Sequence, residues 1–239
     1  MVAEEEVTSV EEFLNTIKQY KEDSNPDDFL FRGQADDHPL IPKISRLQPK
    51  GNLLETERLL LEEFKRTNPL LIEGYQSYDD WDYLTLGQHY GLPTRLLDWS
   101  NSALTALWFA TNRISIESIY GNNNAIVWVL MAAAADYNLD ISETHPFNIK
   151  ETKIFRPRII KQRINNQSGV FSIQPSSEIE QKSQLNTVYP FSEKLLKINL
   201  PSESLKDIRA DLNVLGVNAF SIFPELEGLC AYLQWRYFE

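Results

Sequence analysis

Cysteine and histidine are scarce in this sequence. Its 239 residues include one cysteine, Cys230, and three histidines. A single cysteine excludes an intramolecular disulfide, and no Cys/His cluster has the spacing of a zinc site. We therefore expect neither a disulfide-stabilised scaffold nor a metal cofactor. A reducing cytoplasm suits such a chain.

Long hydrophobic runs are also missing. The longest, Ala125–Ala135, has eleven residues, whereas a membrane-spanning helix needs about twenty. The N-terminus carries three consecutive glutamates at positions 4–6, where a secretory signal would be basic and then apolar. We expect a cytoplasmic protein without a membrane anchor, and we interpret the apolar run as a buried strand.

Positive charge is in deficit. The chain has 23 Lys and Arg against 34 Asp and Glu, which gives a formal net charge of −11 and a pI near 4.8. This balance opposes non-specific attraction to nucleic-acid backbones and to anionic lipid. The basic run Arg156–Arg163 is too short to reverse it and reads as a solvated face. The expected partner is a nucleotide ligand or a protein target.

The composition that is present suits one large domain. Hydrophobic residues make up 42% and charged residues 24%, close to the average for globular proteins, so a packed core is expected. Thr8 and Ser9 each precede a glutamate by three residues, which is the capping-box arrangement before an N-terminal helix over about residues 9–20. Residues 136–192 are polar and interrupted by prolines, and we expect loops and an exposed flap there.

Hydrophobic periodicity predicts alternating helices and strands along the rest of the chain. The predicted strands are Phe29–Gly33, Thr94–Trp99, Ala125–Leu130, Gly169–Ile173, Leu195–Leu200 and Ala219–Phe223. The further predicted helices are Leu53–Thr67, Asp79–His89, one capped by Ser100 or Ser102, one from Ser202 or Ser204 to Leu215, and one after Pro224. The predicted fold is a single α+β domain with a mixed or antiparallel sheet flanked by helices.

Polar and aromatic side chains crowd the segment Gly87–Ser100, at a predicted helix-to-strand turn. Near neutral pH His89 is a donor, an acceptor or a proton carrier. Arg95 either pairs with Asp98 or clamps a phosphate or carboxylate through its planar fork. A structural interpretation makes His89 a packed side chain, Asp98 a helix cap and Arg95 its partner. The concentration of such groups in one segment favours a ligand site.

Three other places carry candidate site residues. Arg32 ends an apolar strand next to Gly33, where it either reaches solvent or faces a pocket. Glu225 and Glu227 open the last predicted helix, where the helix dipole alone explains acidic residues. In a functional interpretation, one of these glutamates is a carboxylate that polarises a sugar-like substrate beside it. Gln167 and Phe171 supply an amide and an aromatic face to the same pocket.

Several of these motifs resemble the FRG domain, named for the first of them. The matching segments are Phe31–Gln34, Gln88–Trp99, Leu107–Ala110, Gln167–Phe171 and Phe223–Leu229. They come in the expected order and indicate one FRG-type domain over residues 1–239, with a core of about 29–233. After Trp99, where the family commonly has threonine and proline, this chain has Ser100 and Ala103. Fold membership alone does not settle function.

The chain is also similar, more weakly, to ADP-ribosyltransferases, which carry an arginine and a glycine on an early strand and a late glutamate. This resemblance implies that Arg32 binds the pyrophosphate or ribose of NAD, and that His89 and Tyr90 frame the nicotinamide. Glu227 or Glu225 would stabilise the developing oxocarbenium charge. The serine-rich strand motif of that class is not evident, and Thr94–Ser100 is only an approximate substitute.

Three hypotheses follow from these features. The leading one is an NAD-dependent ADP-ribosyltransferase acting as a bacterial toxin or anti-phage effector. The second is a module that binds a nucleotide or protein without chemistry, and the third is a nuclease with Asp98 and a glutamate as magnesium ligands. The candidate catalytic residues are Glu227, Glu225 and His89, and the candidate ligand-binding residues are Arg32, Gly33, Tyr90, Thr94, Arg95, Asp98, Trp99, Gln167 and Phe171.

Overall fold

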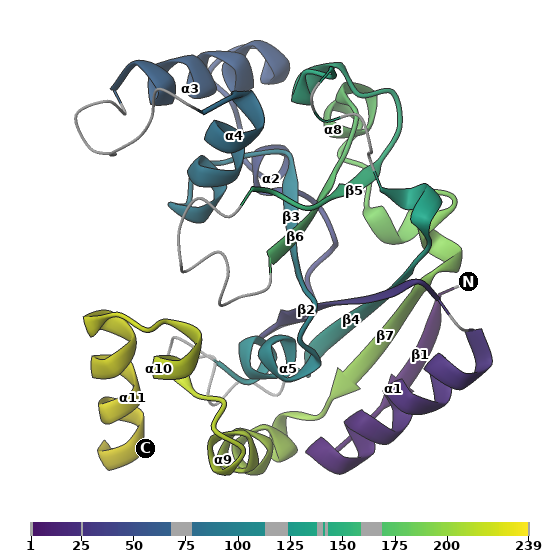
Figure 1. Ribbon diagram of the computed structural model, residues 1–239, viewed down its shortest axis with the longest axis vertical. Coiled ribbons are helices and arrows are strands. Elements are labelled where there is room, and N and C mark those ends of the chain that lie inside the picture. Colours follow the sequence, from purple (N-terminus) through teal and green to yellow (C-terminus); the bar gives the residue numbers. More distant parts are fainter. Residues whose placement is uncertain are drawn as a thin grey trace.

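The computed structural model describes residues 2–24, 26–67, 78–112, 124–137, 141, 143–158 and 169–238. These residues form an α+β fold around one mixed sheet, whose seven strands in the described chain are ordered β1-β7-β4-β2-β3-β6-β5 (Figure 1). The strands are β1 (Ala3–Glu6), β2 (Asp28–Gln34), β3 (Leu96–Ser100), β4 (Ala125–Ala132), β5 (Lys153–Phe155), β6 (Gly169–Ile173) and β7 (Leu195–Leu200). The pair β1 and β7 is parallel, and the other neighbouring pairs are antiparallel.

Helices cover the sheet in two groups, one toward each end (Figure 1). The described helices are α1 (Val10–Ser24), α2 (Lys43–Arg46), α3 (Leu53–Thr67), α4 (Asp80–His89), α5 (Ala103–Thr111), α8 (Ser176–Glu180), α9 (Leu205–Val214), α10 (Ala219–Ile222) and α11 (Leu226–Phe238). Helices α1, α5 and α9 share a buried core with β2, β4 and β7. Helices α3 and α4 share another with β3, β5 and β6. None of the helices in the described chain has the length and apolar character needed to cross a bilayer.

Because successive side chains of a strand point to opposite faces of the sheet, neighbouring residues enter different cores. Phe31 packs under α5, whereas its neighbour Leu30 joins a third core on the opposite face. Leu96 and Phe171 belong to the core under α3 and α4. Because Phe31 pairs with Ser100, and Asp98 pairs with Phe171, all of these positions except Leu30 lie on one face of the sheet. The two helical cores therefore cover the two ends of the same face and leave its middle open.

The join between β2 and β3 is the weakest in the sheet. The ladder between them contains a single residue pair, Phe31 with Ser100, whereas β2 and β4 pair over seven residues from Asp28 to Gln34. Beyond Phe31 the two strands diverge. The open middle of the sheet face therefore coincides with a gap between neighbouring strands.

Most of the predicted elements are confirmed, including the strands that begin at Gly169 and Leu195 and the N-terminal helix. That helix begins at Val10 and runs on to Ser24, and the Ser9 hydroxyl accepts a hydrogen bond from the Glu12 N–H at 3.2 Å. Of the two proposed caps for α5, Ser102 is the one observed, because its hydroxyl accepts from the Thr105 N–H.

One predicted strand is wrong. Residues 219–222 form the helix α10 because the side chain of Asn218 accepts from the N–H groups of Phe220 and Ser221, which caps a helix start. Strand β1 was not predicted. Its sequence, AEEE, has little β-propensity, and it forms against the backbone of β7, a partner distant in sequence.

The described parts of residues 136–192 are not an exposed flap. They contribute the strands β5 and β6 and bury several large aromatic side chains. The buried aromatic side chains are Phe147, Phe155, Phe171 and Phe191. Phe147 and Phe191 lie in short helical turns, and Phe155 and Phe171 lie in β5 and β6, so this polar stretch contains apolar anchors at irregular spacing. The sequence predicted the strand of Phe171 but not the anchors Phe147, Phe155 and Phe191, which stand outside any predicted helix or strand.

Candidate functional site

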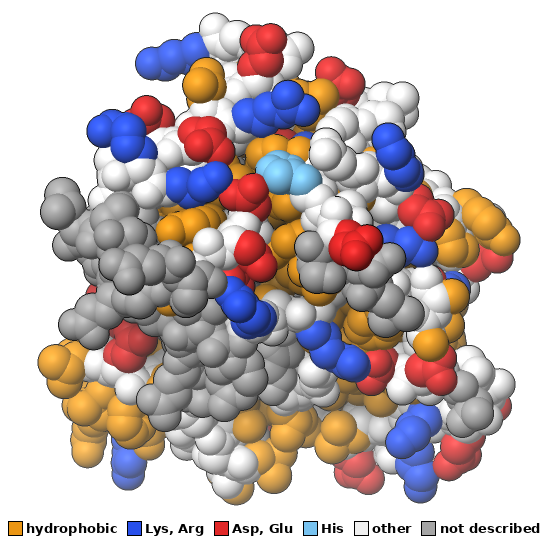
Figure 2. Space-filling view, turned by 45° about the horizontal axis from the view of Figure 1, so that its top comes forward, with side chains coloured by type: hydrophobic (Ala, Val, Ile, Leu, Met, Phe, Trp, Pro, Cys, Tyr) orange, Lys and Arg blue, Asp and Glu red, His pale blue; other side chains and the backbone are white. Residues whose placement is uncertain are grey.

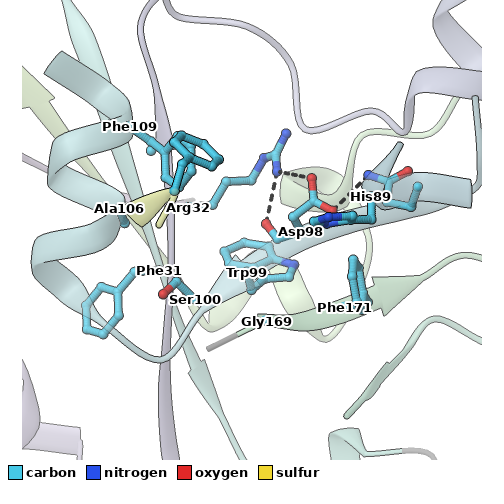
Figure 3. Close-up of a pocket in the computed structure, with 13 residues that line it drawn as sticks. Phe31, Arg32, His89, Asp98, Trp99, Ser100, Ala106, Phe109, Gly169 and Phe171 are labelled. Atoms are coloured by element: carbon cyan, nitrogen blue, oxygen red, sulfur yellow. Dashed lines mark hydrogen bonds and ion pairs between the residues drawn. The ribbon is translucent and has the colours of Figure 1, made fainter. Parts of the chain in front are cut away.

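A cavity of about 330 Å³ occupies the open middle of the sheet face. It lies over the gap between β2 and β3, between the α5 core and the α4 helix (Figure 3). Its lining residues come from five elements and from the residue that follows α10: Phe31, Arg32, Gly33, Gln88, His89, Asp98, Trp99, Ser100, Ala106, Phe109, Gly169, Phe171 and Phe223. Aromatic side chains make up much of the wall, and a small polar group is set among them.

Arg32 extends into the gap between the two strands (Figure 3). Its Nη1 donates a hydrogen bond to the backbone oxygen of Asp98 at 2.9 Å and lies 3.5 Å from the Asp98 carboxylate. Its side chain is 19% exposed, and its Nε atom is buried without a partner among the described residues. Arg32 lines the cavity, and its guanidinium carries further N–H donors besides the one that Asp98 accepts.

Asp98 is held from two sides. Besides Arg32, the amide nitrogen of Gln88 donates to Asp98 Oδ1 at 2.8 Å. The Thr94 hydroxyl donates to Gln88 Oε1 at 2.5 Å and accepts from the Leu96 N–H at 3.2 Å. Because the hydroxyl is oriented by Leu96, it fixes which way the Gln88 amide points. Thr94 is fully buried and acts on the cavity through Gln88, while the Asp98 side chain stays 55% exposed.

His89 and Tyr90 end helix α4 and lie differently. His89 lines the cavity, and its ring stands edge-on to that of Tyr90 with centroids 5.2 Å apart. Tyr90 is 59% exposed and is not part of the cavity wall. The turn after it depends on Gly91, whose φ of +84° favours glycine, and on the Gly87 carbonyl, which accepts from the Leu92 N–H. His89 is therefore the member of this pair placed to contact a ligand.

Trp99 and Phe171 form aromatic parts of the cavity wall. Trp99 is 2% exposed, and its indole N–H donates to the Ser172 hydroxyl at 3.0 Å. Phe171 stacks on Phe155 with ring centroids 5.6 Å apart. Both rings are fixed by packing before any ligand arrives. Gln167, the other residue expected from this motif, lies outside the described residues.

Residues 27–118 match the FRG domain family. This part of the chain is an FRG domain. The matched span contains β2, α4, β3 and α5, and with them Arg32, Gln88, His89 and Asp98. It is shorter than the core of 29–233 expected from the motifs. Searches of curated proteins and of solved structures found no match.

The cavity of the FRG domain is completed by residues that follow the matched span. Gly169 and Phe171 come from β6, and Phe223 comes from the end of α10. Phe223 packs edge-on against Trp108 and Phe109, with centroids 5.9 and 6.0 Å away. The C-terminal part of the chain is therefore needed to close the site.

Arg95 does not belong to the cavity, and the suggested Arg95–Asp98 ion pair is wrong. Arg95 is 1% exposed and forms a bidentate pair with Glu57 of α3, at 2.9 and 2.5 Å. Its guanidinium also lies over the ring of Phe147, 4.6 Å from the centroid. A buried guanidinium needs a buried counter-charge, and Glu57 supplies it. Through this pair, Arg95 anchors helix α3 to the segment that precedes β3.

Gly33 of the name-giving motif has a packing role. A Cβ atom at this position would lie 1.9 Å from the backbone oxygen of Ala106 and 2.7 Å from the backbone nitrogen of Ala110. Helix α5 thus rests directly on the backbone of β2. This close approach places Ala106 and Phe109 in the cavity wall beside Arg32. The glycine at position 33 is explained by this close packing of α5 on β2, without any contact to a ligand.

Glu225 and Glu227 do not line the cavity. Both side chains are exposed, at the start of α11. Gly228, which follows them, is constrained because a Cβ there would lie 1.9 Å from the Phe223 oxygen. The acidic motif at the end of the chain thus contains a packing glycine and a cavity residue, Phe223. The carboxylate that the described structure places in the cavity wall is Asp98.

Charged side chains of both signs are mixed on one face of the molecule. On the face in Figure 2, basic and acidic side chains are interspersed among the described residues. Groups of three or more His, Cys, Asp or Glu side chains arranged to hold a metal ion do not occur in the described part of the chain. The polar side chains that line the cavity are those of Arg32, Gln88, His89, Asp98 and Ser100.

Proposed function

We propose that the cavity binds a nucleotide, with NAD as the ligand and substrate. The observation that supports this best is the position of Arg32 and Asp98, side by side in a largely aromatic cavity. A guanidinium binds phosphate through paired N–H donors, and a carboxylate accepts hydrogen bonds from ribose hydroxyls. Aromatic walls suit the flat rings of a base.

The size of the cavity fits part of such a ligand. Its volume of about 330 Å³ lies at the lower end of the range of small-molecule sites, roughly 300–1,000 Å³. A nucleoside fills a space of this order, so one half of a dinucleotide enters while the rest lies along the mouth. His89 and the aromatic wall contact the base, and Arg32 reaches the phosphate at the mouth.

The reaction in this proposal is ADP-ribosyl transfer. The bond between the nicotinamide nitrogen and ribose C1′ breaks, and its electron pair leaves with nicotinamide. The acceptor's lone pair then bonds to C1′, and the acceptor's proton passes to a carboxylate or to water. A nearby carboxylate stabilises the positive charge that develops on the ribose. Asp98 lines the cavity and suits this role, while Glu225 and Glu227 follow the cavity residue Phe223 by two and four positions.

The acceptor belongs to a cellular target in this proposal, and modification of that target makes the chain a toxin or an anti-phage effector. A protein target would approach the mouth of the cavity, where Asp98 is more than half exposed. The N-terminal Glu4–Glu6 strand and the net charge of −11 favour a target with a basic surface.

A specific observation favours a second candidate function, a nucleotide sensor without chemistry. Asp98 is already engaged by Arg32 and Gln88, and neither Glu225 nor Glu227 lines the cavity. A carboxylate held in this way orients a ribose. Among the described residues, the cavity wall then holds no second carboxylate that could act as an acid or base. Such a module would bind the nucleotide and return it unchanged.

The test follows NAD labelled in its adenylate half, incubated with the purified protein and cell extract. Nicotinamide release and transfer of label are measured for the wild type, for Arg32→Ala and for Arg58→Ala. Arg58 lies exposed on α3, away from the cavity, so its variant controls for the loss of one positive charge. Transfer that depends on Arg32 alone supports the transferase. Binding without turnover supports the sensor, and the absence of both contradicts the nucleotide site.

A further inference from the structure

Helix α11, at the edge of the molecule beyond α10 (Figure 1), packs on the rest of the described chain through one face. Near its start, a Cβ atom at Gly228 would lie 1.9 Å from the Phe223 oxygen, so the helix rests directly on the end of α10. Farther along, Tyr232 and Trp235 pack beside α9, and the Arg209 guanidinium lies over the Trp235 ring, 5.3 Å from its centroid. Positions 228, 232 and 235 recur at the helical period and form the inner face of α11.

The outer face of α11 is apolar. It consists of Leu226, Cys230, Leu233 and Tyr237, and because successive residues of a helix are about 100° apart, these side chains point away from the inner face. Leu226, Leu233 and Tyr237 are 79%, 41% and 70% exposed, and Cys230 is exposed as well. A surface helix normally turns polar side chains to water and apolar ones to the core. The outer face of α11 therefore has the composition of a contact surface.

The spacing of the outer face matches the seam of a coiled coil. Its residues are four, three and four positions apart, which is the alternation of a and d positions in a heptad repeat. Such a seam is self-complementary, because its side chains fit between those of an identical helix. Glu227 stands in the first turn of α11 and Arg236 in the last. An antiparallel pair therefore brings the acidic end of each helix to the basic end of the other, and it also aligns the two macrodipoles favourably.

We propose that the outer face of α11 binds the same face of a second copy of this chain, with the two helices antiparallel about a twofold axis. A helix of 13 residues is about 20 Å long, so the contact lies at the low end of the range for specific interfaces, below about 1,200 Å² in total. We therefore expect a reversible dimer of roughly micromolar affinity. The four outer-face residues lie outside the cavity wall, so this inference does not depend on the proposed nucleotide function.

The test measures self-association of the full chain by sedimentation equilibrium, at protein concentrations up to well above the micromolar range. The wild type is expected to dimerise. Leu233→Lys places a charge in the middle of the seam and should raise the dissociation constant of the dimer at least about tenfold. Ala231→Lys is the matched control, because it adds the same charge to the same helix at an exposed position away from the outer face. It should change the dissociation constant by less than about twofold.

Arg236→Glu tests the direction of the two helices. In an antiparallel dimer it brings acidic groups together at each end of the contact, and it should weaken dimerisation about fivefold at low ionic strength. Combining it with Glu227→Arg reverses the charge of both ends and should restore the wild-type affinity. A wild type that stays monomeric, or a dimer that Leu233→Lys leaves intact, overturns the inference. A dimer that Arg236→Glu leaves unchanged overturns the antiparallel arrangement.

Discussion

Arg32 bridges two strands that share a single ladder pair: its Nη1 donates to the Asp98 backbone oxygen at 2.9 Å while lying 3.5 Å from the carboxylate of the same residue. The contact replaces a backbone hydrogen bond at the point where β2 and β3 separate. It also leaves the other carboxylate oxygen of Asp98 to Gln88, while Arg32 itself lines the cavity. The same pair thus stabilises the gap in the sheet and supplies its polar chemistry.

The buried pair of Arg95 and Glu57 should dominate the stability of the FRG domain. Arg95→Met leaves the Glu57 carboxylate buried, 2% exposed, without its partner. We expect a loss of about 3–5 kcal/mol in the free energy of unfolding, measured by urea denaturation. The exposed pair Arg66–Glu63 is the matched control, and Arg66→Met should cost under about 1 kcal/mol. Similar effects of the two substitutions would contradict the assignment of Arg95 to the structure.

Gly33→Ala should disrupt the contact between α5 and β2. The added methyl group meets the Ala106 backbone oxygen at 1.9 Å, so a helix backbone must move. We expect a loss of about 2–4 kcal/mol or failure to fold, read from thermal unfolding. Gly51→Ala, where nothing lies within 4 Å of the new atom, should change stability by about 0.5 kcal/mol or less. A well-tolerated Gly33→Ala would contradict the packing role.

Thr94→Val should affect the ligand more than the fold. The substitution keeps the shape of a fully buried side chain but removes the hydroxyl that orients the Gln88 amide. We expect stability to fall by about 1 kcal/mol and nucleotide affinity to fall severalfold, since Gln88 then no longer reliably donates to Asp98. Affinity is measured by calorimetry on both proteins. If the affinity equals that of the wild type, Thr94 has no positioning role.

The N-terminal helix should respond to acid through Glu12. Hydrogen bonds from the Thr8 N–H and hydroxyl lower the pKa of Glu12 below its ordinary value of 4.5. A carboxyl whose pKa is depressed on folding stabilises the fold above its unfolded pKa, and this contribution is lost as pH falls through its folded pKa. Glu12→Gln should therefore flatten the decline of the unfolding temperature in the acidic range below pH 4.5. An unchanged pH profile would contradict the capping role of Glu12.

The sequence predicted β2, α4, β3, α5 and β6, which carry most of the site, because their signals are local. Capping residues marked α5, and the apolar run beginning at Ala125 marked β4. Six candidate site residues line the cavity: Arg32, Gly33, His89, Asp98, Trp99 and Phe171. His89, Asp98 and Trp99 stand in the crowded segment Gly87–Ser100, whereas Arg32, Gly33 and Phe171 became candidates mainly through the family resemblances.

What escaped prediction depends on contacts between distant segments. Arg95 appeared to be a ligand residue because its partner, Glu57, lies 38 positions away on another helix. Phe109 and Phe223 stood in motif segments but were not named as site candidates, and the strand predicted to end at Phe223 is in fact the helix α10 with Phe223 as its cap. Gln88 stood within the motif, but only the structure shows that its amide contacts Asp98. No spacing rule shows which side chains a turn buries.

The measurement that tests the central claim most directly is equilibrium binding of NAD to the wild type, Arg32→Ala and Arg58→Ala. If the cavity is a nucleotide site, NAD binds to the wild type and Arg58→Ala with equal affinity. Its binding to Arg32→Ala is then weaker by about tenfold or more, the equivalent of one charge-assisted contact. Equal affinity of all three proteins for NAD, or binding to none of them, would contradict the account.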